Sequence, residues 1–218
     1  MANNFYNAVR RNISADSTLP TEVYLTPNGL KSIAIELDVS NKSSAGVTVT
    51  VQLEDESQNL AGTTAQQVST VATNTTGDLT TAAVHALVLN DRIIFTNGTD
   101  PTFTVGSLPP SADTALSETR MYYVQKIEST TKIRIAESRN ATSALTFATN
   151  GASVVFTKIH IADIVKDAPV PVGGALKVIS GQKLVLQSDS TGVNDKIYAY
   201  SSGASACDVI ASVLQDVS

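Results

Sequence analysis

The sequence predicts an all-β fold: an antiparallel β-sandwich of the jelly-roll or immunoglobulin-like kind, with a second small β domain inserted in a loop. Three observations predict it. Short segments of alternating apolar and polar residues recur at the spacing of roughly 8–12 residues that is typical of sandwiches and barrels. Turn-forming residues separate these segments. The 218 residues include 26 Thr and 23 Ser, and the β-branched Thr side chain suits a strand better than a helix interior.

The first clear strands are typical of a hairpin. Residues 33–39 place four apolar side chains in one phase: Ile33, Ile35, Leu37 and Val39. After a polar loop, residues 47–53 alternate in the same way. A period of two over two consecutive segments indicates antiparallel strands with one dry and one wet face, and neither segment shows the 3.6-residue period of a helix.

A second group of strands closes the chain. Pro169, Pro171, Gly173 and Gly174 predict a turn, because proline removes a ladder hydrogen bond and glycine tolerates tight turns. The strands expected around this turn are residues 158–161, 175–180, 183–187, 195–201 and 207–214.

The middle of the chain has a different pattern of polar and apolar residues. It is polar and weakly patterned at first, and alternation then resumes at residues 92–96, 121–127, 131–136, 144–148 and 152–157. We interpret residues 60–157 as a β module inserted between two parts of a sandwich, residues 20–59 and 158–218, with residues 1–19 as an N-terminal arm. The alternative is one continuous sandwich with long loops.

The charge and hydropathy of the chain indicate which kinds of partner to expect. The net charge is −5, and Arg10-Arg11 is the one compact basic pair in the sequence, so we expect no nucleic-acid partner. No stretch reaches the roughly 18 apolar residues of a membrane span, so we expect no membrane partner. The first residues lack the pattern of a secretory signal, so we expect synthesis in a cytoplasm.

Few side chains are suited to catalysis or metal binding. Nucleophilic catalysis needs a positioned base, and the histidines are His85, which we predict in a turn, and His160, which we predict on the polar phase of a strand. Cys207 is the one cysteine and is expected to pack as a small buried apolar residue. The sequence therefore predicts no enzyme, with no catalytic residue and no cofactor.

The acidic residues are interpreted in the same way. Glu54-Asp55-Glu56 follows a strand and is expected to be a solvated linker rather than an acid/base pair. Asp189, Asn194 and Asp195 could offer oxygen ligands to Ca²⁺, but their spacing fits no EF-hand loop, and a turn is the favoured interpretation. No metal site is predicted.

Two parts of the chain resemble bacteriophage proteins. Residues Val23–Gly29 (VYLTPNG) and the hairpin after them resemble small β-sandwich structural proteins of tailed phages, notably marine cyanophage-like ones. The resemblance continues in the closing part of the chain, over residues 165–176, 183–202 and 208–214. The middle resembles a module of phage tail, neck and decoration proteins, through residues 85–87, 91–95, 122–124 and 131–133. Ala86 and Asn90 depart from that module, which often carries glycine there.

This resemblance implies a non-enzymatic structural protein of a tailed-phage virion, assembling in symmetric copies at the neck, the head–tail junction or the tail. Its partners would be other virion proteins and copies of itself. A capsid decoration (cement) protein is the alternative, and a glycan-binding adhesin module is the alternative of another class. The absence of Trp disfavours the adhesin, because glycan sites use exposed aromatic rings. The candidate assembly contacts lie in the N-terminal arm, which could instead be a disordered tail: Phe5, Tyr6, Val9, Arg10 and Arg11.

Overall fold

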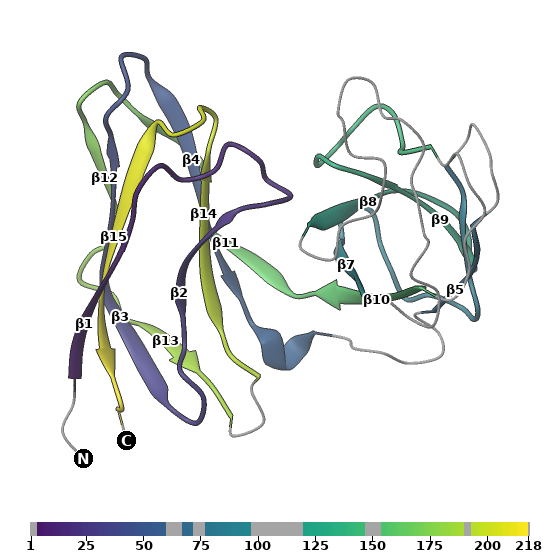
Figure 1. Cartoon of the computed structure of the whole chain (residues 1–218), viewed down its shortest axis with the longest axis horizontal. Helices are drawn as coiled ribbons and strands as arrows, with labels where there is room; N and C mark the ends of the chain where they lie inside the picture. The colour runs from purple at the N-terminus through teal and green to yellow at the C-terminus, as the bar shows by residue number, and fades with distance from the viewer. Residues whose placement is uncertain are drawn as a thin grey trace. The chain divides into compact units, whose positions relative to one another are not determined.

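A computed structural model of the chain describes residues 4–59, 67–71, 77–96, 120–146, 154–189 and 193–217. The chain divides into two compact units, one formed by residues 1–58 with 160–218 and the other by residues 59–159. Both units are built from antiparallel strands (Figure 1). The predicted all-β sandwich with a second small β domain inserted in a loop is confirmed.

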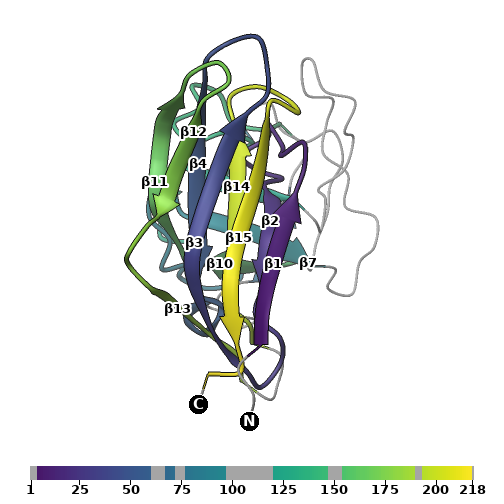
Figure 2. The same ribbon diagram turned by 90° about the vertical axis from the view of Figure 1, so that its left-hand side faces the viewer.

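The first unit is a sandwich of two sheets. Sheet A has the order β1-β15-β3-β12, and β13 also pairs with β3; Figure 2 shows β1, β15 and β3 side by side. Its strands are β1 (Asn4–Arg10), β3 (Lys31–Asn41), β12 (Ala175–Ile179), β13 (Leu184–Gln187) and β15 (Cys207–Gln215). Sheet B has the order β11-β4-β14-β2. Its strands are β2 (Thr21–Leu25), β4 (Val47–Glu54), β11 (Ile161–Val170) and β14 (Lys196–Ser201).

The core of the sandwich consists of the inward side chains of both sheets. Alternation along each strand sends every second residue inward, so Leu37 and Val209 of sheet A and Val49 and Ile197 of sheet B are fully buried. Each such side chain contributes roughly 1.5–3 kcal/mol relative to its exposed state.

The predicted phase of β3 is wrong in its first half. Leu37 and Val39 are buried as expected, but Ile33 and Ile35 are only partly buried, and Ala34 is buried between them. The cause is a β-bulge: Ser212 pairs with Glu36, whereas the next residue of β15, Val213, pairs with Ala34. One extra residue in β3 reverses the faces of all residues before it.

Strand β4 is buried on both faces, although the sequence predicts one wet face. Its polar residues Thr50, Gln52 and Glu54 are at most 2% exposed, because β4 is a central strand between β11 and β14. Glu54 Oε2 lies 3.6 Å from Lys196 Nζ of β14, and the other two side chains are paired with β11. The Gln52 amide donates to Asp163 Oδ1 at 2.6 Å, and the Asp167 N–H donates to Thr50 Oγ1 at 3.1 Å.

Residues 1–19 are predicted as an arm, but the structure differs. Asn4–Arg10 form β1, which pairs with β15 in an unbroken register from Asn4↔Gln215 to Arg10↔Val209. Ala8 points into the core and is 1% exposed, and Ile13, beyond the strand, is also fully buried. These apolar side chains make the segment part of the sandwich.

The second unit is a closed barrel with the strand order β10-β5-β6-β9-β8-β7. Its strands are β5 (Gln67–Val71), β6 (Leu79–Thr81), β7 (Arg92–Thr96), β8 (Met121–Ser129), β9 (Lys132–Ala136) and β10 (Val154–Ile159). Phe95 contacts Tyr122 and Phe156 edge to face in its core, with ring centroids 5.6 and 6.5 Å apart. Closure removes sheet edges, so a short chain of short strands can form a stable barrel.

Two further features of the barrel concern Gly77 and the strand predicted at residues 144–148. Gly77 has a φ of +77°, and a Cβ there would lie 1.9 Å from the Leu145 carbonyl oxygen, so only glycine fits. The strand predicted at 144–148 is not formed by residues 144–146, and residues 147–148 lie outside the described residues.

The burial pattern predicts unequal effects for two aspartate substitutions. Val49→Asp places an unpaired charge in the core and is expected to cost about 3–5 kcal/mol of unfolding free energy. Ile35→Asp, on the outer face beside the bulge, is expected to cost about 1 kcal/mol. Urea unfolding measures both, and equal losses would contradict the bulged register.

Replacing residues 59–159 with a short Gly/Ser linker is expected to leave a folded sandwich. The two ends of the cut lie together, because Glu54 pairs with Ile161 and the Asp55 N–H donates to the His160 carbonyl at 3.1 Å. Circular dichroism should show β structure with a cooperative thermal transition. A chain without that transition would mean that the sandwich needs the barrel to fold.

Candidate assembly surface

The outer face of sheet A carries a row of apolar side chains. Phe5 lies opposite Leu214, Leu214 opposite Ile33, and Ile33 opposite Val185, so the row crosses β1, β15, β3 and β13. We call these four residues the apolar row. Phe5 is 74% exposed and Val185 51% exposed, and the other two are half-buried.

A second exposed apolar pair lies further along β1. Val9 lies opposite Ile210 of β15, and the two side chains are 46% and 48% exposed. Single exposed apolar residues are common, but a group that spans neighbouring strands is typical of an interaction surface. The outer face of sheet A over the apolar row, Val9 and Ile210 is therefore the candidate assembly surface.

The edge of β1 is also suited to pairing. In the part of the chain that the structure describes, β1 pairs with β15 alone, over seven consecutive residues without a register shift. The other outer strands β2, β11 and β12 each contain at least one register shift, and β13 has only four residues. Bulges and short strands protect edges against pairing with another chain, and β1 has neither.

The predicted assembly contacts do not all face outward. Phe5 and Val9 are exposed on the candidate surface. Arg10 Nε instead donates to the Glu22 carbonyl at 2.7 Å, and the Tyr6 ring lies 6.2 Å from the Tyr24 ring. Both of these side chains connect β1 to β2 within the sandwich.

Arg11 is exposed and lies near an ionic cluster. Lys42 Nζ is 2.7 Å from Asp208 Oδ1, and the Asn12 N–H donates to the same oxygen at 2.9 Å. These hydrogen bonds, with the charges of Lys42 and Arg11, lower the pKa of Asp208. Of the five predicted contacts, the structure therefore places Phe5 and Val9 on the outer face and turns Tyr6, which is 45% exposed, and Arg10, which is half-buried, toward β2. Arg11 is exposed beside this cluster.

Sequence reasoning missed the β3, β13 and β15 members of this surface: Ile33, Val185, Ile210 and Leu214. No local pattern brings these residues together, because their alignment depends on strand register. In the sequence, Val185 and Ile210 are each flanked by two apolar residues, so nothing local marks them as outward-facing.

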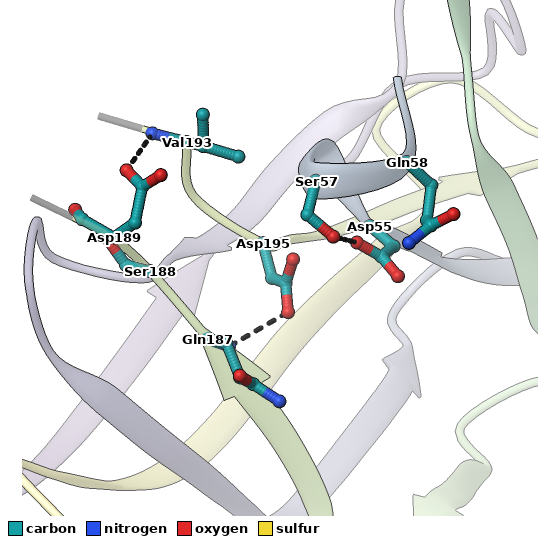
Figure 3. A pocket seen from close by; sticks show the side chains of 8 residues that line it. All are labelled: Asp55, Ser57, Gln58, Gln187, Ser188, Asp189, Val193 and Asp195. Carbon is teal, nitrogen blue, oxygen red and sulfur yellow. Dashed lines mark hydrogen bonds between the residues drawn. The ribbon is translucent and has the colours of Figure 1, made fainter. Parts of the chain in front are cut away.

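A polar pocket lies at one end of the sandwich, between the 3₁₀ helix Glu56–Gln58 and the segment that follows β13 (Figure 3). Its cavity volume is about 360 Å³. The residues that line it are Asp55, Ser57, Gln58, Gln187, Ser188, Asp189, Val193 and Asp195.

The carboxylates of this pocket accept hydrogen bonds from nearby groups of the chain. Asp195 Oδ2 accepts from the Gln187 N–H at 2.8 Å, and Asp189 Oδ1 from the Val193 N–H at 3.1 Å. Asn194 donates to Asn28 Oδ1 at 2.7 Å. Hydrogen bonds of this kind are typical of a turn, which is the interpretation that the sequence favours over a Ca²⁺ site. Among the described residues, no three His, Cys, Asp or Glu side chains are grouped as metal ligands.

The side chains that could act as nucleophile or base have structural surroundings. His85 Nε2 is 3.0 Å from the Ser129 carbonyl, and its Nδ1 accepts from the Leu87 N–H at 3.3 Å, so the ring connects its own segment to the end of β8. His160 is exposed between β10 and β11. Cys207 is fully buried, and burial raises the pKa of its thiol.

Comparisons with known proteins give no match, whether with family models, with curated protein sequences or with solved structures. Over the described ranges, no helix has the length and apolarity needed to cross a membrane.

The carboxyl groups of Asp195 and Asp208 are expected to change the stability of the fold with pH in opposite directions. Burial, with Asp55 and Glu56 nearby, raises the pKa of Asp195, so the folded state holds this proton to a higher pH than the unfolded chain does. Asp195 therefore destabilises the fold as the pH rises above its unfolded pKa. Asp195→Asn is expected to raise the melting temperature at pH 7 but not at pH 3.

Asp208 is the matched control. Because its pKa is lowered in the folded state, its ionised form stabilises the fold above the unfolded pKa, and this contribution is lost as the pH falls through the folded pKa. Asp208→Asn is expected to lower the melting temperature at pH 7. Melting curves from pH 3 to pH 7 that shift in the same direction for both variants would contradict these assignments.

Proposed function

We propose that this chain is a non-enzymatic structural component of a tailed-bacteriophage virion, which assembles in symmetric copies at the neck, the head–tail junction or the tail. The observation that carries the proposal is the candidate assembly surface: the apolar row, with Val9 and Ile210, beside an unprotected edge strand. Segments of the sandwich and of the barrel resemble proteins of tailed phages, and this resemblance is the reason for placing the surface in a phage particle.

The physical argument concerns the strength of contacts. A surface of separate exposed apolar residues gives a weak contact between two isolated molecules, since stable interfaces bury about 1,200–2,000 Å² in total. In a ring or shell, each copy is held by several contacts at high effective concentration, so weak contacts are sufficient. A repeated virion protein therefore needs many modest surfaces rather than one deep pocket.

The surroundings of the polar groups support a non-enzymatic function. His85 bonds to the Leu87 N–H nearby in the sequence and to the Ser129 carbonyl at the end of β8. Asp189 and Asp195 each accept a backbone N–H. These are hydrogen bonds that hold turns and strands in place.

A capsid decoration protein would use the same surface on the phage head. Both functions predict the chain in purified particles, so location within the particle separates them. Electron microscopy of particles labelled with antibody against the chain should place it at the neck or tail. Label on the head would favour the decoration protein, and unlabelled particles that lack the chain would contradict both.

Substitutions on the candidate surface are expected to reduce incorporation into the particle. Phe5→Asp places a charge in the apolar row, and we expect about tenfold less of the chain per particle, equivalent to about 1.4 kcal/mol in the binding of one copy. Ser40→Lys on β3, also exposed but outside the row, is the control and should leave the amount unchanged. Quantitative mass spectrometry of purified particles measures both, with melting curves to show that each variant is folded.

Normal incorporation of Phe5→Asp would show that the apolar row is not an assembly contact. Hydrolysis of a host polysaccharide by the purified chain would overturn the non-enzymatic function as a whole.

A further inference from the structure

We infer that sheet A continues through β1 into a second copy of the same chain, with the two β1 strands antiparallel and Asn7 opposite the partner's Asn7. This inference rests on the proposed role of the β1 surface in assembly, and it names the occupant of that surface.

The first argument is the geometry of the edge. In an antiparallel sheet, the backbone groups of alternate residues point away from the neighbouring strand. No strand among the described residues pairs with that side of β1. Its seven residues contain no proline and no bulge, so the edge can accept a further strand over its whole length.

The second argument is the order of residues in β1. The residues of β1 are Asn-Phe-Tyr-Asn-Ala-Val-Arg, and their pattern of polar and apolar residues is symmetric about Asn7. With two strands antiparallel and centred there, Phe5 lies opposite the partner's Val9, and Tyr6 opposite the partner's Ala8. Apolar side chains then meet on the outer face, a large side chain meets a small one on the other face, and no like charges are opposed.

Other registers fit less well. A shift of one residue places outer-face residues opposite inner-face residues, because side chains alternate with a period of two. A shift of two places Phe5 opposite the partner's Asn7, or Asn7 opposite the partner's Val9, and pairs fewer residues. Only the register centred on Asn7 pairs all seven residues and joins apolar to apolar.

The third argument is continuity of the apolar surface. The row that reaches Phe5 from Leu214 would continue into the partner's Val9 and Ile210, which lie opposite each other in their own sheet. By symmetry, the same contact forms a second time across the two-fold axis. A two-fold contact of this kind is closed, so it produces pairs, and rings or shells need a further contact between pairs.

A cysteine substitution tests the register directly. Asn7→Cys brings two Cα atoms to about 4.5–5.5 Å across the axis, within the range for a disulfide of about 4.4–6.8 Å. Asn4→Cys is the control on the same exposed strand, because its two copies would lie about six residues, or roughly 20 Å, apart. The native Cys207 is fully buried and does not compete.

We expect the purified Asn7→Cys chain to form disulfide-linked dimers under mild oxidation at least tenfold faster than Asn4→Cys. Equal rates for the two variants, or a monomer in both cases, would overturn the register. Because the disulfide traps a weakly populated pair, a low affinity does not hide the result.

A charge experiment tests the pair without a covalent bond. Asn7→Lys and Asn7→Asp each place like charges at the axis, so each alone should sediment as a monomer at concentrations where the native chain dimerises. An equimolar mixture should restore the dimer. Ser40→Lys, exposed on the same face but in β3, should dimerise like the native chain, and a mixture that stays monomeric would overturn the pairing.

The outcomes separate this inference from the proposed function. A chain that is present in phage particles but never cross-links through Asn7→Cys keeps its proposed function and loses the β1 pairing. A chain that cross-links but is absent from particles keeps the pairing and loses the proposed function.

Discussion

The structure of the sandwich depends on strand β15, which lies between β1 and β3 in sheet A. Strand β15 pairs with β1 on one side and with β3 on the other, and its inward residues Val209, Ala211 and Val213 are fully buried. Sheet A therefore forms only when residues about 200 positions apart have met, as the hydrogen bond between Asn12 and Asp208 illustrates. Pairings at this distance in sequence are slow to form because the long loop must close first. The outer-face residues of β1, β15 and β3, including Phe5, Leu214 and Ile33 of the apolar row, are aligned by that pairing.

The fold class could be predicted because the inward positions of a sandwich leave a period of two in each strand. The pattern was misleading where one residue altered the pairing. Ile33 and Ile35 share a phase with Leu37 in the sequence, but the bulge opposite Val213 sends them to the other face. The pairing partner that creates a bulge lies far away in the chain, so the local pattern contains no trace of it.

The site was predicted only in part, for a related reason. The sequence predicts Phe5 and Val9 as contacts, but it predicts an arm rather than a strand, because Ala8 alone is a weak strand signal. Their neighbours across the sheet could not be found, since a row such as Phe5, Leu214 and Ile33 exists only in the register of three strands. The buried polar residues of β4 were missed in the same way, because centrality in a sheet is a property of topology.

The insertion between β4 and β11 has a consequence for how this molecule can change over evolutionary time. Its two attachment points are neighbouring strands that already pair with each other, so the sandwich is complete in its hydrogen bonds whatever lies between them. Substitutions that alter the barrel then need not alter the sandwich core, because the two cores share no residue. Selection can therefore diversify the inserted module at a rate independent of the scaffold that carries it, and the same scaffold can present different modules in related chains.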